Sequence, residues 1–277
     1  MQIKVLVDNN TIIDRYFLAE PALSYLIYDS GKKILFDVGY SDIFIQNAIK
    51  MGESLFDIDY IVISHGHNDH TGGLVHLIAY YSQAIEEGQK FNMPTIIAHP
   101  KAFCYKEYEG LEIGSLLDIK RLKKHFKVIL TKKPFNITKN LIFLGQIARS
   151  NNFENQEPVG KTECKKKLKP DYLKDDSALA YKMPKGLVII TGCSHAGICN
   201  IIEYAKKVCK QDKIIDIIGG FHLLKPSTLQ ATNTLKYFKE QNIKTMHPCH
   251  CTSLKYKIKL SKYSKIKDVG VGLEIKY

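Results

Sequence analysis

Acidic residues and arginine are scarce in this sequence. Its 277 residues include 28 Asp and Glu against 40 Lys and Arg, a formal net charge of +12, and only Arg15, Arg121 and Arg149 are arginines. This excess favours anionic ligands or nucleic acid, although a solvated, lysine-rich surface also accounts for it. The lysines do not alternate with aromatic residues, and no nucleic-acid reader motif is present. We therefore expect a small anionic substrate, with a nucleic-acid-binding or nuclease-type protein as the alternative of another class.

Long apolar runs and a paired cysteine framework are also missing. No apolar stretch reaches the roughly 18 residues of a membrane span, and residues 1–9 lack the basic and apolar regions of a signal peptide. The seven cysteines are an odd number without the even spacings of a disulfide scaffold. These absences predict a soluble cytoplasmic protein with reduced cysteines and no membrane partner. They leave the oligomeric state open.

The order of the expected elements predicts an α/β protein in one domain, residues 1–277. In the first half we expect strands at 3–7, 23–28, 33–38, 59–64 and 94–98, helices at 41–52, from 71 onward and at 116–126, and a β-rich stretch at 127–145. In the second half we expect strands at 186–191, 214–218, 244–247 and 270–277. We also expect one helix from Ser194 or Ala196 to Cys209 and another at 227–242. Two such similar halves suggest two packed sheets with helices outside.

Residues 151–175 interrupt this alternation. They are polar and Lys-rich, and Pro158, Gly160 and Pro170 break any regular pattern. The segment is predicted to be a long loop or an inserted arm rather than a core element. Long loops of this kind usually cover a functional site or are disordered.

The residues with the strongest chemical signal lie in the run Ser64-His-Gly-His-Asn-Asp-His70, which begins where an apolar strand ends. Neutral imidazoles and carboxylates are ligands for zinc, iron or manganese. Residues two apart in an extended segment point the same way, so His65 and His67 can share one metal, and the following turn can aim Asp69 and His70 at a second. This spacing suits two ions that activate one water molecule. The structural alternative is a polar turn of hydrogen-bonded histidines.

Two sites need further ligands from elsewhere in the chain. In Gly192-Cys-Ser-His-Ala-Gly197 a strand ends in a small-residue turn, and we expect His195 to be the third ligand beside His65 and His67. His222 follows the glycine pair Gly219-Gly220 at another strand end, where it is expected to contact the metals or the substrate.

A last group of donors lies in Pro248-Cys-His-Cys-Thr252. His250 is the candidate ligand of the second ion. Cys249 and Cys251 are candidates for a soft metal, although their spacing is not that of a structural zinc knuckle.

The pattern His-x-His-x-Asp-His after a strand, followed by a later histidine at a strand-to-helix turn, resembles the metallo-β-lactamase superfamily. The early Phe-Asp-x-Gly element of that family has its counterpart in Leu35-Phe-Asp-Val-Gly39. The resemblance spans nearly the whole chain and implies a four-layer αββα sandwich of two mixed sheets with outer helices. It also implies that Asp37 supports the metal-binding loop without binding metal itself.

Within the superfamily, the motifs around His195, His222 and His250 resemble the branch that includes dihydropterin-ribofuranosylaminobenzene-phosphate synthase and many uncharacterised hydrolases. Matches to the branch at Arg149, Glu154 and Asp176 imply that these residues support the metal site or contact the substrate.

Two positions depart from the patterns of the family and the branch. Gly219-Gly220 stands where the family usually has an aspartate that bridges both metals, so His222 is expected to substitute in part. Ala19-Glu-Pro-Ala22 stands where the branch often has a histidine, so a substrate contact is expected to be missing.

Together these features predict a metal-dependent hydrolase with one or two divalent transition metals, zinc first and iron or manganese as alternatives. Asp69 would orient or deprotonate the attacking water, and His222 would assist. The alternative within enzymes is a synthase that condenses a pterin with an aminobenzene, in which the metal serves the leaving group. A di-iron reductase of oxygen or nitric oxide would need a flavodoxin-like domain, for which the chain has no room.

Overall fold

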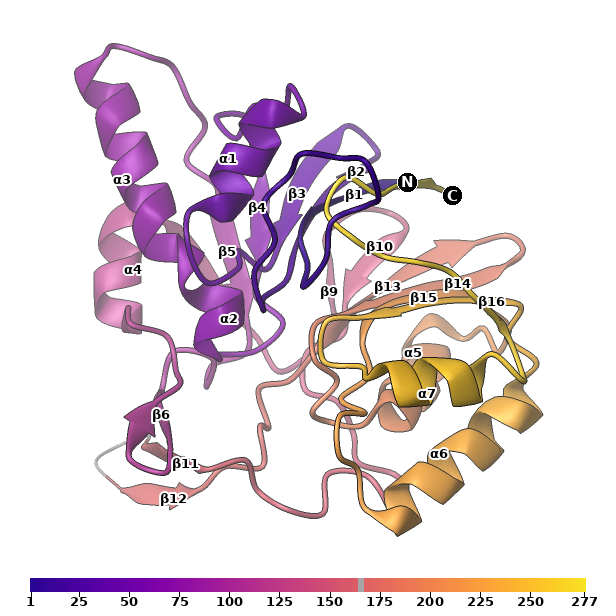
Figure 1. Ribbon diagram of the computed structural model, residues 1–277. Helices are drawn as coiled ribbons and strands as arrows, with labels where there is room; N and C mark the ends of the chain where they lie inside the picture. The colour runs from indigo at the N-terminus through magenta and orange to yellow at the C-terminus, as the bar shows by residue number, and fades with distance from the viewer. Residues whose placement is uncertain (164–166) are drawn as a thin grey trace.

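Two seven-stranded mixed sheets form the centre of the computed structural model, which describes residues 1–163 and 167–277 (Figure 1). The first sheet has the order β18-β1-β2-β3-β4-β5-β8. Its strands are β18 (Glu274–Lys276), β1 (Gln2–Val7), β2 (Ser24–Asp29), β3 (Lys32–Phe36), β4 (Tyr60–Val62), β5 (Thr95–Ala98) and β8 (Lys127–Leu130). The strands from β18 to β3 are antiparallel, and those from β3 to β8 are parallel.

The second sheet repeats this arrangement in the order β17-β16-β15-β14-β13-β10-β9. Its strands are β17 (Lys265–Ile266), β16 (Thr245–Cys249), β15 (Ile214–Gly220), β14 (Gly186–Thr191), β13 (Ala178–Met183), β10 (Leu141–Phe143) and β9 (Phe135–Asn136). The strands from β9 to β14 are antiparallel and those from β14 to β17 are parallel. Each half therefore contributes a set of parallel strands whose carboxyl ends can face a shared site.

Helices cover the outer face of each sheet (Figure 1). On the first sheet they are α1 (Ile43–Lys50), α3 (Gly73–Glu86) and α4 (Ile119–His125), and on the second α5 (Ile198–Cys209), α6 (Thr228–Gln241) and α7 (Leu254–Leu260). The short helix α2 (Asn68–Thr71) follows β4. One buried apolar cluster lies between the sheets and one lies under each helical layer. The predicted α/β class with two mixed sheets and outer helices is thus confirmed.

A third, four-stranded sheet of order β12-β11-β6-β7 stands apart from the sandwich. It combines β6 (Tyr105–Tyr108) and β7 (Leu111–Glu112) with β11 (Lys161–Glu163) and β12 (Leu168–Pro170). The segment 151–175, expected to be a loop or an arm, therefore contains the two strands β11 and β12, and β11 pairs with the unpredicted hairpin of β6 and β7. We call this unit the arm sheet.

Several element boundaries differ from the sequence-based expectations. Helix α4 begins at Ile119 instead of residue 116, because Asp118 accepts a 2.7 Å hydrogen bond from the Arg121 backbone and caps the helix there. The terminal strand β18 is shorter than predicted, and β13 and α7 were not predicted. Both missed elements have weak local signals: β13 contains two alanines, which are uncommon in strands, and α7 is a short Lys-rich helix.

The cysteines are only in part as predicted. Five of them, Cys193, Cys199, Cys209, Cys249 and Cys251, are free and buried. Cys104 is disulfide-bonded, so the expectation of a fully reduced chain is wrong for this residue. Among the described residues, no helix combines the length and apolar character needed to cross a membrane.

Because Ile190 lies in the inter-sheet core and Ile85 does not, replacing each by alanine should change the free energy of unfolding by very different amounts. Ile190 on β14 is fully buried, whereas Ile85 on α3 is 63% exposed. Replacement of Ile190 by alanine should lower the free energy of unfolding by about 2–5 kcal/mol, because the removed methyl groups leave a cavity. The matched Ile85→Ala change should cost less than about 0.5 kcal/mol. Urea unfolding of both variants tests this, and equal losses would contradict the assignment of the core.

Candidate metal centre

The candidate ligands gather at the carboxyl ends of the parallel strands. Residues 64–70, which we call the histidine loop, follow β4, Cys193 and His195 follow β14, and His250 follows β16. Ends of parallel strands in neighbouring sheets meet at one edge, so residues as far apart as Asp69 and His250 become neighbours. Their nitrogen, oxygen and sulfur atoms form two groups, in each of which the atoms lie within 4.8 Å of one another.

The first group consists of His65, His67 and His195, and we call it the three-histidine group. The rings are packed with centroids 4.7–4.8 Å apart. Nε2 of His65, Nε2 of His67 and both ring nitrogens of His195 are buried without a hydrogen-bond partner. Buried polar atoms normally have partners, so three convergent imidazoles with free nitrogens fit a metal ion well.

The protonation of these imidazoles also suits metal binding. Burial lowers the pKa of His67 to about 4, and burial followed by the neighbouring histidines lowers the pKa values of His65 and His195 well below the ordinary range. All three rings are therefore neutral at pH 7 and keep a lone pair for a ligand bond.

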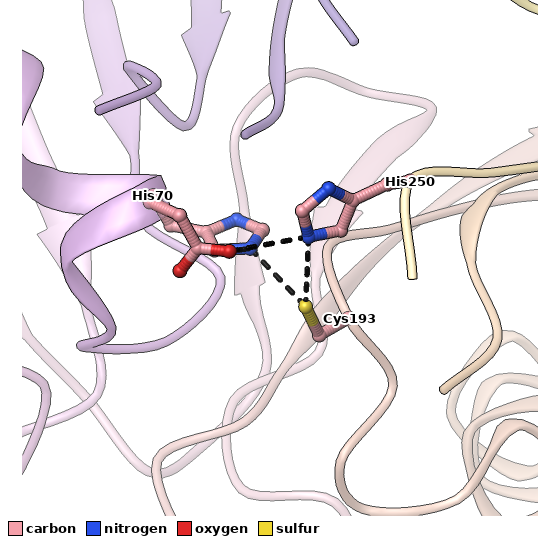
Figure 2. A group of neighbouring side chains, drawn as sticks. His70, Cys193 and His250 are labelled. Atoms are coloured by element: carbon pink, nitrogen blue, oxygen red, sulfur yellow. Dashed lines mark hydrogen bonds and ion pairs between the residues drawn. The ribbon is translucent and has the colours of Figure 1, made fainter. Parts of the chain in front are cut away.

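The second group combines Asp69, His70, Cys193 and His250, and we call it the mixed group (Figure 2). The Cys193 sulfur lies 3.2 Å from Nε2 of His70 and 3.1 Å from Nε2 of His250. Asp69 Oδ2 lies 3.5 Å and 3.3 Å from the same two nitrogens. Four donors at such mutual distances can enclose one tetrahedral ion, and the nitrogen, oxygen and thiolate set is typical of zinc.

Asp37 orients one histidine in each group. Its Oδ2 accepts hydrogen bonds from His70 Nδ1 and from the Ser64 hydroxyl, both at 2.7 Å, and its Oδ1 accepts from the Ser64 backbone at 2.7 Å. Because the Ser64 hydroxyl donates to Asp37, it accepts from His65 Nδ1 at 3.0 Å. Both histidines thus carry their proton on Nδ1 and present Nε2 to the groups. This placement agrees with the supporting role that the family resemblance implies for Asp37.

A buried ion cluster attaches the arm sheet to the histidine loop. Lys106 on β6 is 1% exposed, and its ammonium lies 2.7 Å from Asp171 and 3.0 Å from Asp175. Asp175 also accepts a 2.9 Å hydrogen bond from the Gly66 backbone. Although burial opposes both shifts, the ion pairs raise the pKa of Lys106 and lower that of Asp175, so both groups remain charged. The backbone of Asn68 donates to Ile113 at 2.9 Å and reinforces the attachment.

The three residues that the branch resemblance placed near the site have different surroundings. Asp176 accepts from the Ala196 backbone at 2.8 Å, next to His195, and burial raises the pKa of Asp176 to about 7. Glu154 accepts from the backbones of Cys199 and Asn200 and so caps α5.

The guanidinium of Arg149 donates to the carbonyls of Ile147 and Leu173 at 2.6 and 2.7 Å, and it lines neither of the two pockets at the metal groups. These donors therefore hold the chain at residues 147 and 173, and a contact of Arg149 with the substrate stays a prediction.

Close packing around residues 219 and 220 leaves no room for a side chain and so requires glycine at both positions. A Cβ on Gly219 would lie 1.9 Å from the Thr191 carbonyl, and one on Gly220 would lie 2.5 Å from the Cys251 sulfur. His222 lies outside both groups, and its contact with a metal or the substrate stays a prediction. Its ring lies 4.2 Å from that of His195, with Nδ1 buried and unpartnered. The structure places the Cys193 thiol in the mixed group.

The C-terminal motif has two thiols, those of Cys249 and Cys251, and both lie outside the two groups. Cys249 faces the inter-sheet core, where its sulfur is 3.1 Å from the Tyr25 hydroxyl. The Cys251 sulfur donates to the Cys193 carbonyl at 3.3 Å. The thiol that lies among the candidate ligands is that of Cys193, and soft-metal binding by Cys249 or Cys251 stays a prediction. The strand-end position of Cys193, two residues before His195, was the signal that could have identified it.

Two pockets open onto the metal groups. One, of about 480 Å³, is lined by His67, Asn68 and Asp69 of the histidine loop. The other, of about 440 Å³, is lined by Ser194, His195 and His222. Val159 lines both pockets, so the segment predicted to cover a site does border this one.

Comparisons with known proteins agree with this picture. A model of the metallo-β-lactamase superfamily matches residues 19–90. The chain is 36% identical over 273 residues to an uncharacterized protein of Methanocaldococcus jannaschii, with 98% of each chain covered. It is 30% identical over 255 residues, 86% of this chain and 83% of the relative, to a protein of that organism named 7,8-dihydropterin-6-methyl-4-(β-D-ribofuranosyl)-aminobenzene-5′-phosphate synthase. Among solved structures, Tm1679, a metal-dependent hydrolase of the β-lactamase superfamily, matches with a TM-score of 0.83 and 29% identity, covering 100% of this chain and 99% of that one.

The mixed group predicts a thiolate–metal bond from Cys193. Wild-type protein should bind about two metal ions per chain and Cys193→Ser about one, since a serine hydroxyl is a poor ligand at neutral pH. In cobalt-substituted protein, the thiolate-to-metal charge-transfer band should be present in the wild type and in Cys251→Ser and absent in Cys193→Ser. A band that persists without Cys193 would contradict the ligand set.

The buried ion cluster predicts that Lys106 stabilises the protein far more than a surface lysine does. Lys106→Met leaves two buried carboxylates without a cation and should reduce the free energy of unfolding by about 3–5 kcal/mol. The control is Lys161→Met on β11, whose exposed ammonium lies 3.8 Å from Glu107 and should contribute at most about 1 kcal/mol. Urea denaturation at pH 7 distinguishes the two, and a loss below 1 kcal/mol for Lys106→Met would refute the anchoring role.

Proposed function

The chain belongs to the metallo-β-lactamase superfamily, and we propose that it is a metal-dependent hydrolase of an anionic ester or phosphoester. The observation that carries this proposal is the three-histidine group, with its buried, unpartnered nitrogens beside two open pockets. Three protein ligands with a remaining open position are typical of catalytic zinc sites, whereas closed sets of four are typical of structural ones. The similarity to a metal-dependent hydrolase at 29% identity supports the same reaction class.

The proposed ligands divide between the two groups. His65, His67 and His195 would hold one ion, and Asp69, His70, Cys193 and His250 would hold the other. Zinc fits these donors best, with iron or manganese as alternatives for the imidazole-rich group. Bound divalent ions would supply Lewis-acid activation of water and stabilise the negative charge that develops on the substrate.

The remaining chemistry belongs to the side chains that face the pockets. Asp69 is 26% exposed along its side chain and lines the pocket next to His67, so its carboxylate can orient a water molecule or take up its proton. His222 lines the opposite pocket, and its buried Nδ1 is free to bond a substrate oxygen. Asp37 and Ser64 fix the rings of His70 and His65, so little reorganisation is needed during the reaction.

A pterin–aminobenzene synthase is the second candidate. The named synthase is 30% identical over 86% of the chain, and such a reaction would use the same metal groups to hold a leaving group instead of activating water. Thermal protection by a pterin but not by phosphoesters, with no hydrolysis of either, would favour the synthase.

The proposal predicts that hydrolysis requires the three-histidine group. Protein purified without oxygen is assayed against phosphoesters, lactones and thioesters, with metal content measured by mass spectrometry. His67→Ala should lose metal and reduce turnover at least about 100-fold. The exposed His76→Ala on α3 should retain both. Turnover that survives in His67→Ala, or after complete chelation of the metal, would overturn the assignment.

A further inference from the structure

The pocket on the Asp69 side of the centre has apolar walls. Its floor is formed by His67, Asn68 and Asp69, whereas the rest of its lining is apolar or aromatic: Pro21, Tyr40, Tyr108, Ile113 and Val159. Among the described residues, no lysine or arginine lines it. The protein has a net charge of +12, yet this side of the candidate site is bordered by uncharged rings. An apolar lining of this kind favours binding of an apolar part of the ligand.

The two tyrosines of this pocket are unusually accessible for large aromatic side chains. Tyr40 is 55% exposed and Tyr108 is 48% exposed. They come from different parts of the chain, Tyr40 from the loop after β3 and Tyr108 from β6 of the arm sheet. Rings that remain open to solvent at the mouth of a pocket can stack on a flat ligand at little conformational cost.

The backbone on both sides of this pocket is anchored by hydrogen bonds and ion pairs. The arm sheet is attached to the histidine loop by the bridge between His67 and Gly114, and the buried ion cluster of Lys106 lies two residues from Tyr108. Tyr40 lies next to the turn in which Glu20 accepts hydrogen bonds from the Tyr40 and Ser41 backbones at 2.9 and 3.1 Å. Because these contacts already fix the backbone positions of both tyrosines, ligand binding requires less ordering of the pocket.

The opposite pocket differs in character. Beyond His195 and His222, its lining combines apolar residues with polar and charged ones: Phe153, Pro158, Val159, Leu224 and Pro226 together with Asn155, Gln156, Glu157, Ser194, Lys225, Ser227 and Gln230. The centre thus separates an apolar, aromatic side from a mixed side that also offers hydrogen-bonding and charged groups.

We propose that the substrate carries a planar aromatic ring that binds between Tyr40 and Tyr108 on the Asp69 side, while its polar portion extends past the metal groups toward His222. This proposal rests on the proposed function, because hydrolysis at the metal groups defines where the reacting bond of the substrate lies. It assigns Tyr108 as a specificity-determining residue that contacts the ring. Pro21, at the position where the branch often has a histidine, adds an apolar surface to the same pocket.

Isothermal titration calorimetry on the metal-loaded protein tests the ring pocket independently of turnover. Naphthylphosphonate and propylphosphonate share an anionic head group and differ in the ring. The wild type should bind the naphthyl ligand at least about tenfold more tightly, because the ring is buried against aromatic walls. Tyr108→Ala should lose most of this preference, and Tyr108→Phe should keep it. Affinity for propylphosphonate and metal content should stay unchanged in both variants.

Tyr105 provides the matched control. It lies on the same strand β6 and is 39% exposed, but it does not line the pocket, so Tyr105→Ala should retain the full preference. Equal binding of the two ligands, no detectable binding of the naphthyl ligand, or an unchanged preference in Tyr108→Ala would each overturn the inference. A protein that shows the ring preference but hydrolyses no ester would refute the proposed hydrolysis and leave the ring pocket standing.

Discussion

The hydrogen bonds of the Asp37 carboxylate are the interaction on which the centre depends. One buried side chain fixes Ser64 at the end of β4 and His70 in α2, and through the Ser64 hydroxyl it also fixes His65. Each of the two metal groups therefore contains one imidazole whose orientation is set by the same carboxylate. Asp37 adopts φ of 53°, a conformation that costs energy for a non-glycine residue and persists here because three hydrogen bonds hold it.

The second sheet can approach this carboxylate only because the chain has glycine at the point of contact. A Cβ on Gly192 would lie 2.2 Å from the Ser64 hydroxyl and 3.0 Å from Asp37 Oδ2. The close approach places the next residue, Cys193, against His70 and His250. The chain has Gly219-Gly220 where the family resemblance implies a bridging aspartate, and its second half places a thiol near the histidines from a different strand end. A thiol is a softer donor than a carboxylate, and softer donors suit zinc better than they suit magnesium or calcium.

Local patterns predicted the elements with strong periodicity and the residues at their ends. The histidine loop, His195 and His250 were identifiable because apolar strands end directly before them, and the structure brings all of them together. Contacts that join distant segments left no local signal. Nothing in the sequence around Lys106 distinguishes it from the other lysines, because its partners Asp171 and Asp175 come close only in the folded chain. Cys193 was passed over because histidine dominates its motif, and the arm sheet because its strands are short and polar.

The central claim is that two neighbouring metal ions are held by different donor sets, one of them containing a thiolate. Anomalous X-ray diffraction from crystals of metal-loaded protein, recorded at the absorption edge of the bound metal, tests it most directly. The account predicts one peak among the ring nitrogens of His65, His67 and His195 and a second peak bonded to the Cys193 sulfur, Asp69, His70 and His250. A single peak, or a second peak with no bond to Cys193, would contradict it.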